Sequence, residues 1–175
     1  MKVFGIDPGS YVTGWGVVQC EGSKLHGVAA GTLQVGKTLP LSERLCILHQ
    51  GLCGLMDEHA PEAIAVESIF FAKHANAALK LGHVRGVALL AAAQCGRAIH
   101  EYPPATVKKA VGGKGNADKS QVARFVGALL GWRDLPALDA TDALAVAITH
   151  AQAAPYLGRL RRSVGCSDSV VRRDR

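Results

Sequence analysis

Near its beginning the chain reads IDPGSYVTGWGVV, residues 6–18, and this segment carries the main signal for the fold. A short apolar run ends at Asp7, a Pro-Gly turn follows, and a second apolar run then begins. Two apolar runs joined by such a turn predict neighbouring strands. Aspartate often starts turns, because its side chain bonds nearby backbone amides. On this stretch alone, a turn role for Asp7 is therefore slightly favoured over a chemical one.

The rest of the chain predicts an α/β fold with a mixed five-stranded sheet, in which three antiparallel strands precede parallel crossovers. Crossover connections are right-handed, and sites form at the carboxyl ends of parallel strands. Asp7 and Glu67 are therefore expected side by side at one sheet edge. The expected strands are 2–7, 13–19, 24–35, 61–68 and 97–102, and the expected helices are 40–59, 74–95, 103–113, a helix capped by Asn116 and ending before Gly131, and 139–153.

Length and composition indicate one domain. The chain has 175 residues and is 49% hydrophobic, and we expect a single domain over residues 1–156 with an Arg-rich, disordered tail over 157–175. The longest apolar run, residues 87–93, is too short to span a bilayer, and no signal peptide is visible. Five scattered cysteines fit reduced thiols. These features predict a cytoplasmic protein without a membrane segment.

Charge is distributed unevenly along the chain. Residues 70–125 contain nine Lys and Arg against two acids, whereas residues 1–69 contain four against seven. A clustered basic surface indicates a polyanionic partner such as nucleic acid. The alternative is an ordinary solvated helical surface.

Two further acids lie in LDATDALAVAITH, residues 138–150. Asp139 and Asp142 are three residues apart at a helix start, so both project from one face. They could simply cap the helix. If they meet Asp7 and Glu67, however, four carboxylates repel each other unless a cation lies between them. Oxygen ligands favour Mg²⁺, with Mn²⁺ as a substitute, and two such ions can activate a water and stabilise a leaving phosphate oxygen.

Four segments resemble the RuvC family of Holliday junction resolvases over residues 2–153. They are IDPGSYVTGWGVV, AVESIFFAK, NAALKLGHVRGVA and LDATDALAVAITH. The resemblance implies an RNase H-like fold, a homodimer, and Mg²⁺-dependent paired nicking of four-way DNA junctions alongside the branch-migration proteins RuvA and RuvB. Gly82 and Gly86, four apart on an apolar helix, suit the dimer. The family's four metal-binding acids fall on Asp7, Glu67, Asp139 and Asp142.

The resemblance also implies DNA-contacting residues. Phe70 falls where the family places an aromatic near the junction centre, and such a ring can stack on an unpaired base. Lys108 and Lys119 match positions near the scissile phosphate, so Lys119 joins the expected catalytic residues. The start of a helix within GKGNADKS, residues 113–120, is expected to offer its amides and Lys119 to a phosphate. Lys73, Lys80 and Arg85 are further expected backbone contacts, and His150 is expected to be structural.

Three other functions stay open from the residues alone. A strand ending in Asp before a glycine turn also begins actin-like and sugar-kinase ATPases, but those need a second such domain. A non-catalytic junction- or RNA-binding module would use the acids only as caps. A nuclease of the same fold acting on RNA or ordinary duplex would need the same basic block, because phosphate contacts do not read sequence.

Overall fold

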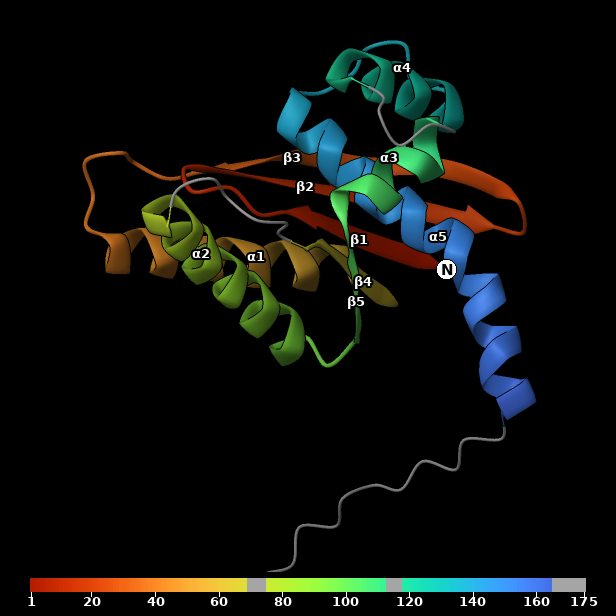
Figure 1. Cartoon of the computed structure of the whole chain (residues 1–175), viewed down its shortest axis with the longest axis horizontal. Helices are drawn as coiled ribbons and strands as arrows, with labels where there is room; N and C mark the ends of the chain where they lie inside the picture. The colour runs from red at the N-terminus through yellow and green to blue at the C-terminus, as the bar shows by residue number, and fades with distance from the viewer. Residues whose placement is uncertain (69–74, 113–117, 165–175) are drawn as a thin grey trace, which may run out of the picture.

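A computed structural model describes residues 1–68, 75–112 and 118–164 (Figure 1). In this part of the chain, five strands form one sheet in the order β3-β2-β1-β4-β5. The strand β1 pairs antiparallel with β2 and parallel with β4, β2 pairs antiparallel with β3, and β4 pairs parallel with β5. This confirms the predicted mixed sheet. The strands are β1 (Lys2–Asp7), β2 (Val12–Glu21), β3 (Lys24–Gln34), β4 (Ala63–Glu67) and β5 (Ala98–Tyr102).

Helices cover both faces of the sheet (Figure 1). Two of them, α1 (Leu41–His59) and α2 (Ala75–Gln94), pack on one face over a core that includes Phe4, Ile6 and Ile64. The other face carries α3 (Pro104–Gly112), α4 (Lys119–Leu130) and α5 (Leu138–Val164) over a core that includes Val3 and Val18. Successive residues of a strand point to opposite faces, which is why Val3 and Phe4 enter different cores.

Helix α5 lies directly on the sheet because glycines face it. A Cβ added at Gly5 would lie 2.1 Å from the carbonyl oxygen of Ala143, and one at Gly14 would lie 1.9 Å from that of Asp139. Both separations are far below van der Waals contact, so only glycine permits this approach. The two contacts therefore set the height of α5 above β1 and β2.

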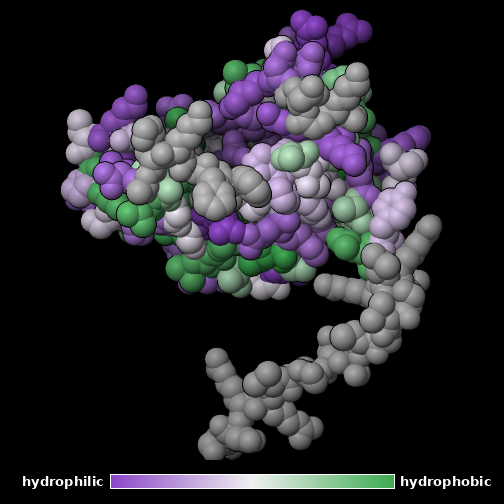
Figure 2. Space-filling view, in the orientation of Figure 1, coloured by the Kyte–Doolittle hydropathy of each residue, from purple (hydrophilic) through white to green (hydrophobic). Residues whose placement is uncertain are grey.

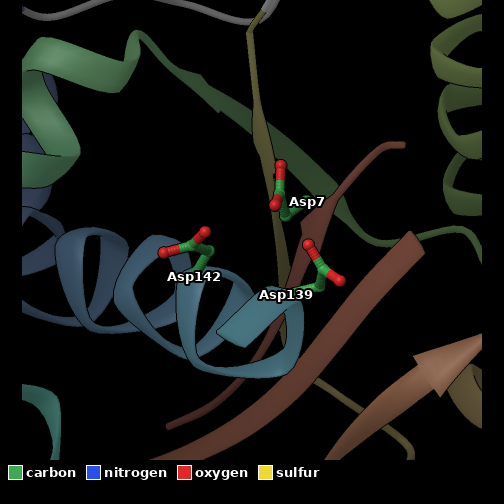
Figure 3. A group of neighbouring side chains, drawn as sticks. All are labelled: Asp7, Asp139 and Asp142. Atoms are coloured by element: carbon green, nitrogen blue, oxygen red, sulfur yellow. The ribbon is translucent and has the colours of Figure 1, made fainter. Parts of the chain in front are cut away.

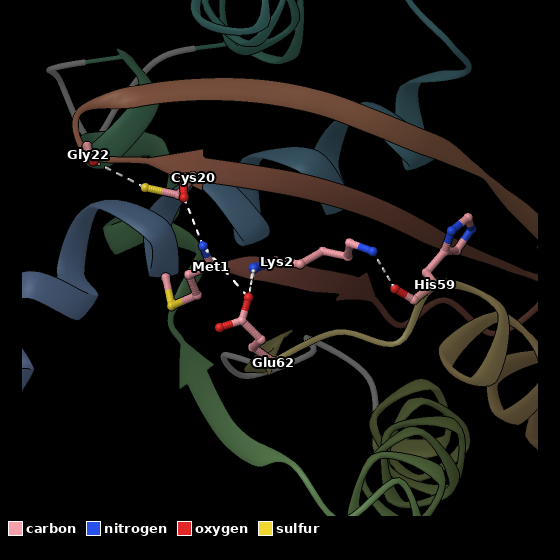
Figure 4. A network of polar contacts seen from close by, with 6 residues as sticks. All are labelled: Met1, Lys2, Cys20, Gly22, His59 and Glu62. Carbon is pink, nitrogen blue, oxygen red and sulfur yellow. Dashed lines mark hydrogen bonds and ion pairs between the residues drawn. The ribbon is translucent and has the colours of Figure 1, made fainter.

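The amino-terminal end of β1 is held by a polar network (Figure 4). The Met1 ammonium donates to the Cys20 carbonyl at 2.8 Å, and it lies 3.7 Å from the Glu62 carboxylate. The Lys2 amide donates to Glu62 at 2.9 Å, and the Lys2 Nζ donates to the His59 carbonyl at 2.9 Å. Every charge in this network has a partner of opposite charge or polarity.

A buried histidine joins α5 to β5. His150 is 3% exposed, its Nδ1 hydrogen-bonds with the Tyr102 hydroxyl at 2.8 Å, and its ring stacks on His100 with 4.0 Å between centroids. Burial, and then His100, lowers the pKa of His150 to about 4. This histidine is therefore a neutral packing element, as expected.

Two helix boundaries differ from the prediction. Helix α4 is capped by Asp118 rather than by Asn116, which lies outside the described residues, because Asp118 accepts the Gln121 amide at 2.8 Å. Helix α5 continues to Val164, past the domain boundary expected at residue 156, and it includes Pro155. Five of the eight residues from 157 to 164 are Leu or Arg, which are good helix formers. No helix among the described residues combines the length and apolarity that crossing a membrane requires.

Candidate acidic metal centre

Three structural elements bring the four predicted acids to one edge of the sheet. Asp7 ends β1 and Glu67 ends the parallel neighbour β4, whose Val66 is paired with Ile6. The parallel pairing therefore places these two carboxylates side by side, as predicted. Asp139 and Asp142 come from the start of α5, which the Gly14 contact holds over the same edge.

The three aspartates converge (Figure 3). One carboxylate oxygen from each of Asp7, Asp139 and Asp142 can be chosen so that all three atoms lie within 4.8 Å of one another. Glu67 is not one of these three residues, but its side chain is hydrogen-bonded to Asp7. Asp139 lies within the first turn of α5 rather than at the position before the helix. The capping alternative for Asp139 is therefore not what the structure shows.

The carboxylates of this edge are held in an environment that opposes their ionisation. Burial, followed by the charge of Asp7 and the hydrogen bond to it, raises the pKa of Glu67 to about 8. Burial is also the largest cause that raises the pKa of Asp7, with the charges of Asp142 and Asp139 adding to it. Like charges at close range disfavour each other's ionised form. Near neutral pH, Glu67 therefore keeps its proton and donates it to Asp7, unless a cation neutralises the carboxylates.

Among the described residues, Lys119 is the cation that is hydrogen-bonded to this centre. Its Nζ donates to Asp142 Oδ2 at 3.0 Å from the first residue of α4. The hydrogen bond with Asp142 and the charges of Asp142, Asp7 and Asp139 raise the pKa of Lys119. Its side chain is 64% exposed, whereas that of Asp142 is 22% exposed. One ammonium thus faces a group of acids from the solvent side.

The Gln121 amide in the first turn of α4 is not open to a phosphate, contrary to the expectation for this helix start. The Asp118 carboxylate accepts from the Gln121 amide and from the Ser120 hydroxyl, and these bonds lower its pKa. The Gln121 side chain in turn accepts from the Asp118 amide at 3.2 Å. This reciprocal capping arrangement fills the helix start with its own carboxylate. Only the Lys119 part of the expectation lies at the acidic centre.

The donor set fits a hard divalent cation. Oxygen atoms alone converge at the three aspartates, and Mg²⁺ and Mn²⁺ prefer carboxylate oxygens. Partly buried carboxylates at such range are costly without a cation between them, which agrees with the raised pKa values of Asp7 and Glu67. These residues are therefore suited to hold a divalent cation.

The remaining predicted residues lie in different surroundings. Lys80 is exposed on α2, and Lys108 is half-buried on α3. Arg85 makes a hydrogen-bonded ion pair with Glu101, so its charge already has a partner within the chain. Phe70 and Lys73 lie outside the described residues.

Two positions near the centre were not anticipated from the sequence. Gly14 pairs with Asp7 across the β1–β2 ladder, and it is the residue on which Asp139 rests. Thr13 is buried, and its hydroxyl lies 3.4 Å from the Gly9 amide and 3.3 Å from the Gly9 carbonyl, across the turn after Asp7. The available signal was a glycine inside a strand, which marks a close approach by another backbone.

Comparisons with known proteins agree with this arrangement. Residues 3–150 match the family model for "Crossover junction endodeoxyribonuclease RuvC". A protein of that name from Rhodopseudomonas palustris (strain BisA53) is 47% identical over 161 residues, which cover 92% of each chain. Another from Bradyrhizobium diazoefficiens is 48% identical over 151 residues, which cover 86% of each.

Solved structures show the same fold. The chain superposes on Thermus thermophilus RuvC with a TM-score of 0.81 and 36% identity, covering 89% of this chain and 96% of that one. The structure of T. thermophilus RuvC in complex with a Holliday junction substrate superposes with a TM-score of 0.81 and 34% identity, again covering 89% of this chain and 96% of that one. The yeast mitochondrial resolvase Ydc2 shares the fold at 14% identity and a TM-score of 0.65. The expected RNase H-like fold is thus confirmed, and the chain belongs to the RuvC family of crossover junction endodeoxyribonucleases.

Proposed function

We propose that this chain resolves four-way DNA junctions by paired, symmetric, metal-dependent nicking of two strands. The proposal rests on the convergence of three aspartates in a chain that belongs to this family. Glu67 is hydrogen-bonded to one of them, Asp7. A carboxylate site for divalent ions beside a basic surface is suited to phosphodiester hydrolysis. The acids would hold the metal, and Lys and Arg would hold the strand.

Asp7, Glu67, Asp139 and Asp142 are the proposed metal-binding and catalytic carboxylates, with Mg²⁺ or Mn²⁺ as the ion. Two such ions supply an activated water and stabilisation of the leaving oxygen. Before metal binds, the Glu67–Asp7 pair holds a proton, and this proton must leave because ligand carboxylates bind metal in their ionised form. Metal affinity is therefore expected to rise between pH 6 and pH 8.

Lys119 is the proposed catalytic cation. Its ammonium is held by Asp142 at the solvent-facing side of the aspartates. A phosphate approaching the acids from solvent would meet this ammonium, which could neutralise charge that develops on the phosphate oxygens. Lys108 and Lys80 are proposed backbone contacts, whereas Arg85 would contact DNA only by sharing or leaving Glu101. Phe70 and Lys73 stay predictions.

The apolar face of α2 supports a homodimer. Leu79 is 63% exposed and Leu90 is 52% exposed, and a Cβ at Gly82 or Gly86 would meet nothing within 4 Å. Figure 2 shows hydrophobic atoms along this helix. Two copies meeting here would carry two acidic centres related by a twofold axis, which suits symmetric nicking. Association with RuvA and RuvB stays an expectation from the family resemblance.

The test is cleavage of a synthetic four-way junction in Mg²⁺ or Mn²⁺, with binding measured in Ca²⁺. Symmetric nicks by the wild type that vanish in Asp7→Asn, with binding kept, are expected. Equal cleavage by both proteins would remove Asp7 from the site, and binding without nicks in both would favour a non-catalytic binding module. Cleavage of RNA or plain duplex in preference to the junction would favour another nuclease of this fold.

A further inference from the structure

A buried arginine contacts the turn that follows Asp7, and it has no acidic partner among the described residues. Arg44 on α1 is 8% exposed, and no ion pair within the described part of the chain includes it. One guanidinium nitrogen donates to the Ser10 carbonyl at 3.4 Å, and Nε has no hydrogen-bond partner. A buried cation without a carboxylate opposes folding. The Arg44 charge is therefore better explained by a function, such as binding an anion, than by a contribution to folding stability.

One aromatic ring brings a second cation to this arginine. The Arg44 guanidinium carbon lies 4.9 Å from the Tyr11 ring centroid, and the Lys37 Nζ lies 5.9 Å from it. Both distances are within the range of cation–π attraction. Tyr11 is 37% exposed and Lys37 is exposed, so the solvent-facing side of the group is reachable. We call Tyr11, Lys37 and Arg44 the Tyr11 cluster.

The Tyr11 cluster lies at the same end of the sheet as the acids. Tyr11 is in the turn between β1 and β2, four residues after Asp7, and its carbonyl accepts the Val35 amide at 3.0 Å. Four residues span at most about 14 Å. Phosphates recur about every 3.4 Å along the axis of one DNA strand. A strand held at the acids is therefore within about four nucleotides of the cluster.

The charge of this region is also distinctive. Residues 1–69 contain only four Lys and Arg against seven acids, and two of those four meet at the Tyr11 ring. Carboxylates repel the phosphates of a DNA strand. A positive group at the same end of the sheet can bind one of these phosphates. A buried charge is also screened by salt less than an exposed one.

We propose that the Tyr11 cluster binds the DNA backbone on the strand that enters the acidic centre. Lys37 contacts a phosphate directly, Arg44 supplies a buried positive charge behind it, and the Tyr11 ring holds both cations in place. This inference rests on the proposed function, to which it adds a phosphate contact outside the basic block of residues 70–125. Because it reads only phosphate, it is independent of base sequence.

The test compares Lys37→Ala with Lys24→Ala in the full-length protein. Lys24 is also exposed, but it lies at the β2–β3 turn, at the opposite end of the sheet. Binding to a four-way junction and to a plain duplex is measured in Ca²⁺ over a salt series. We expect Lys37→Ala to weaken binding about 3- to 10-fold and to reduce the salt slope by about one. Lys24→Ala should match the wild type, and equal affinity for both variants would overturn the proposal.

Arg44 separates a binding role from a structural one. Arg44→Met removes the charge but keeps an unbranched side chain in the core. We expect its melting temperature to equal or exceed that of the wild type, with DNA affinity reduced at least 5-fold. A lower melting temperature with unchanged DNA affinity of the folded protein would make Arg44 structural and overturn its part. Tyr11→Phe should bind as the wild type does, and Tyr11→Ala should bind more weakly.

These measurements distinguish failure of this inference from failure of the proposed function. A wild type that binds duplex DNA but neither prefers nor cuts junctions would contradict the proposed function. The Lys37 contact would then still be supported by a reduced salt slope on duplex, and contradicted by an unchanged one.

Discussion

The two ends of β1 differ in how their charges are arranged. At the Lys2 end, an ammonium and a lysine meet Glu62 and backbone carbonyls, so each charge is satisfied (Figure 4). At the Asp7 end, like charges gather, and Lys119 is the cation hydrogen-bonded to them in the described part of the chain (Figure 3). The first end favours the folded chain. The second opposes it until a cation arrives, which is typical of a site selected for binding.

The largest expected effect comes from breaking the acidic end. Asp7→Asn should lower junction cleavage by roughly 10³-fold or more, because the negative charge and one of the two carboxylate oxygens of a proposed metal ligand are lost together. Without metal, the same variant should melt a few °C higher, because one repelling charge is removed. Cleavage assays and thermal unfolding in EDTA measure the two effects. Retained cleavage together with unchanged melting would contradict the comparison.

Gly14 tests whether the helix contact positions the acids. Gly14→Ala places a Cβ 1.9 Å from the Asp139 carbonyl, so α5 must shift. We expect a loss of about 1–3 kcal/mol in the free energy of unfolding and about a 10-fold loss of cleavage. Urea unfolding and single-turnover cleavage provide the readouts. The control is Gly54→Ala on α1, where nothing lies within 4 Å and stability should instead rise by about 0.5–1 kcal/mol.

The metal-free protein should become less stable as pH rises. The pKa of Glu67 is raised from 4.5 to about 8, so between these values the folded state holds a proton that the unfolded state has released. Stability therefore falls across this window, by about 1–3 kcal/mol. Chemical unfolding in EDTA at pH 5 and pH 8 measures it. Glu67→Gln, or saturating Mg²⁺, should flatten the dependence, and an equally steep profile in Glu67→Gln would contradict this assignment.

His150 should give a pH dependence of the opposite sign. Its pKa is lowered from 6.5 to about 4, so the unfolded state binds a proton that the folded state lacks, and stability is lost as pH falls through this window. We expect a loss of about 1–2 kcal/mol between pH 6.5 and pH 4.5. His150→Gln should remove this slope while leaving metal affinity at pH 7.5 unchanged. A slope that persists in the variant would assign acid sensitivity to other groups.

The smallest effect is expected at the satisfied end of β1. Glu62→Gln removes the charge that faces Met1 but keeps an oxygen for the Lys2 amide. Exposed ion pairs contribute little, so the loss in unfolding free energy should be under about 1 kcal/mol, and cleavage should not change. Calorimetry and the junction assay provide the measurements. A large loss of cleavage here would show that the two ends of β1 are coupled.

Sequence patterns alone were enough to predict the order and type of the elements and to select four candidate acids. Turn residues, alternation and helical spacing are local signals, so the five strands were located to within about two residues. The parallel pairing of β1 with β4 also followed from the handedness of crossovers, and it placed Asp7 beside Glu67. The shared edge of Asp7 and Glu67 followed from these strand ends, whereas the metal-binding role of Asp139 and Asp142 was predicted from the resemblance to the RuvC family.

How those acids meet, and which groups surround them, depends on packing between distant segments of the chain. The height of α5 depends on Gly5 and Gly14 meeting backbone atoms more than 100 residues away in the chain. Three contacts join separate elements: Lys119 hydrogen-bonds to Asp142, Arg85 pairs with Glu101, and the Arg44 guanidinium packs on the Tyr11 ring. No local pattern encodes such contacts, because packing between distant segments sets the distances and the solvent exposure on which charge interactions depend.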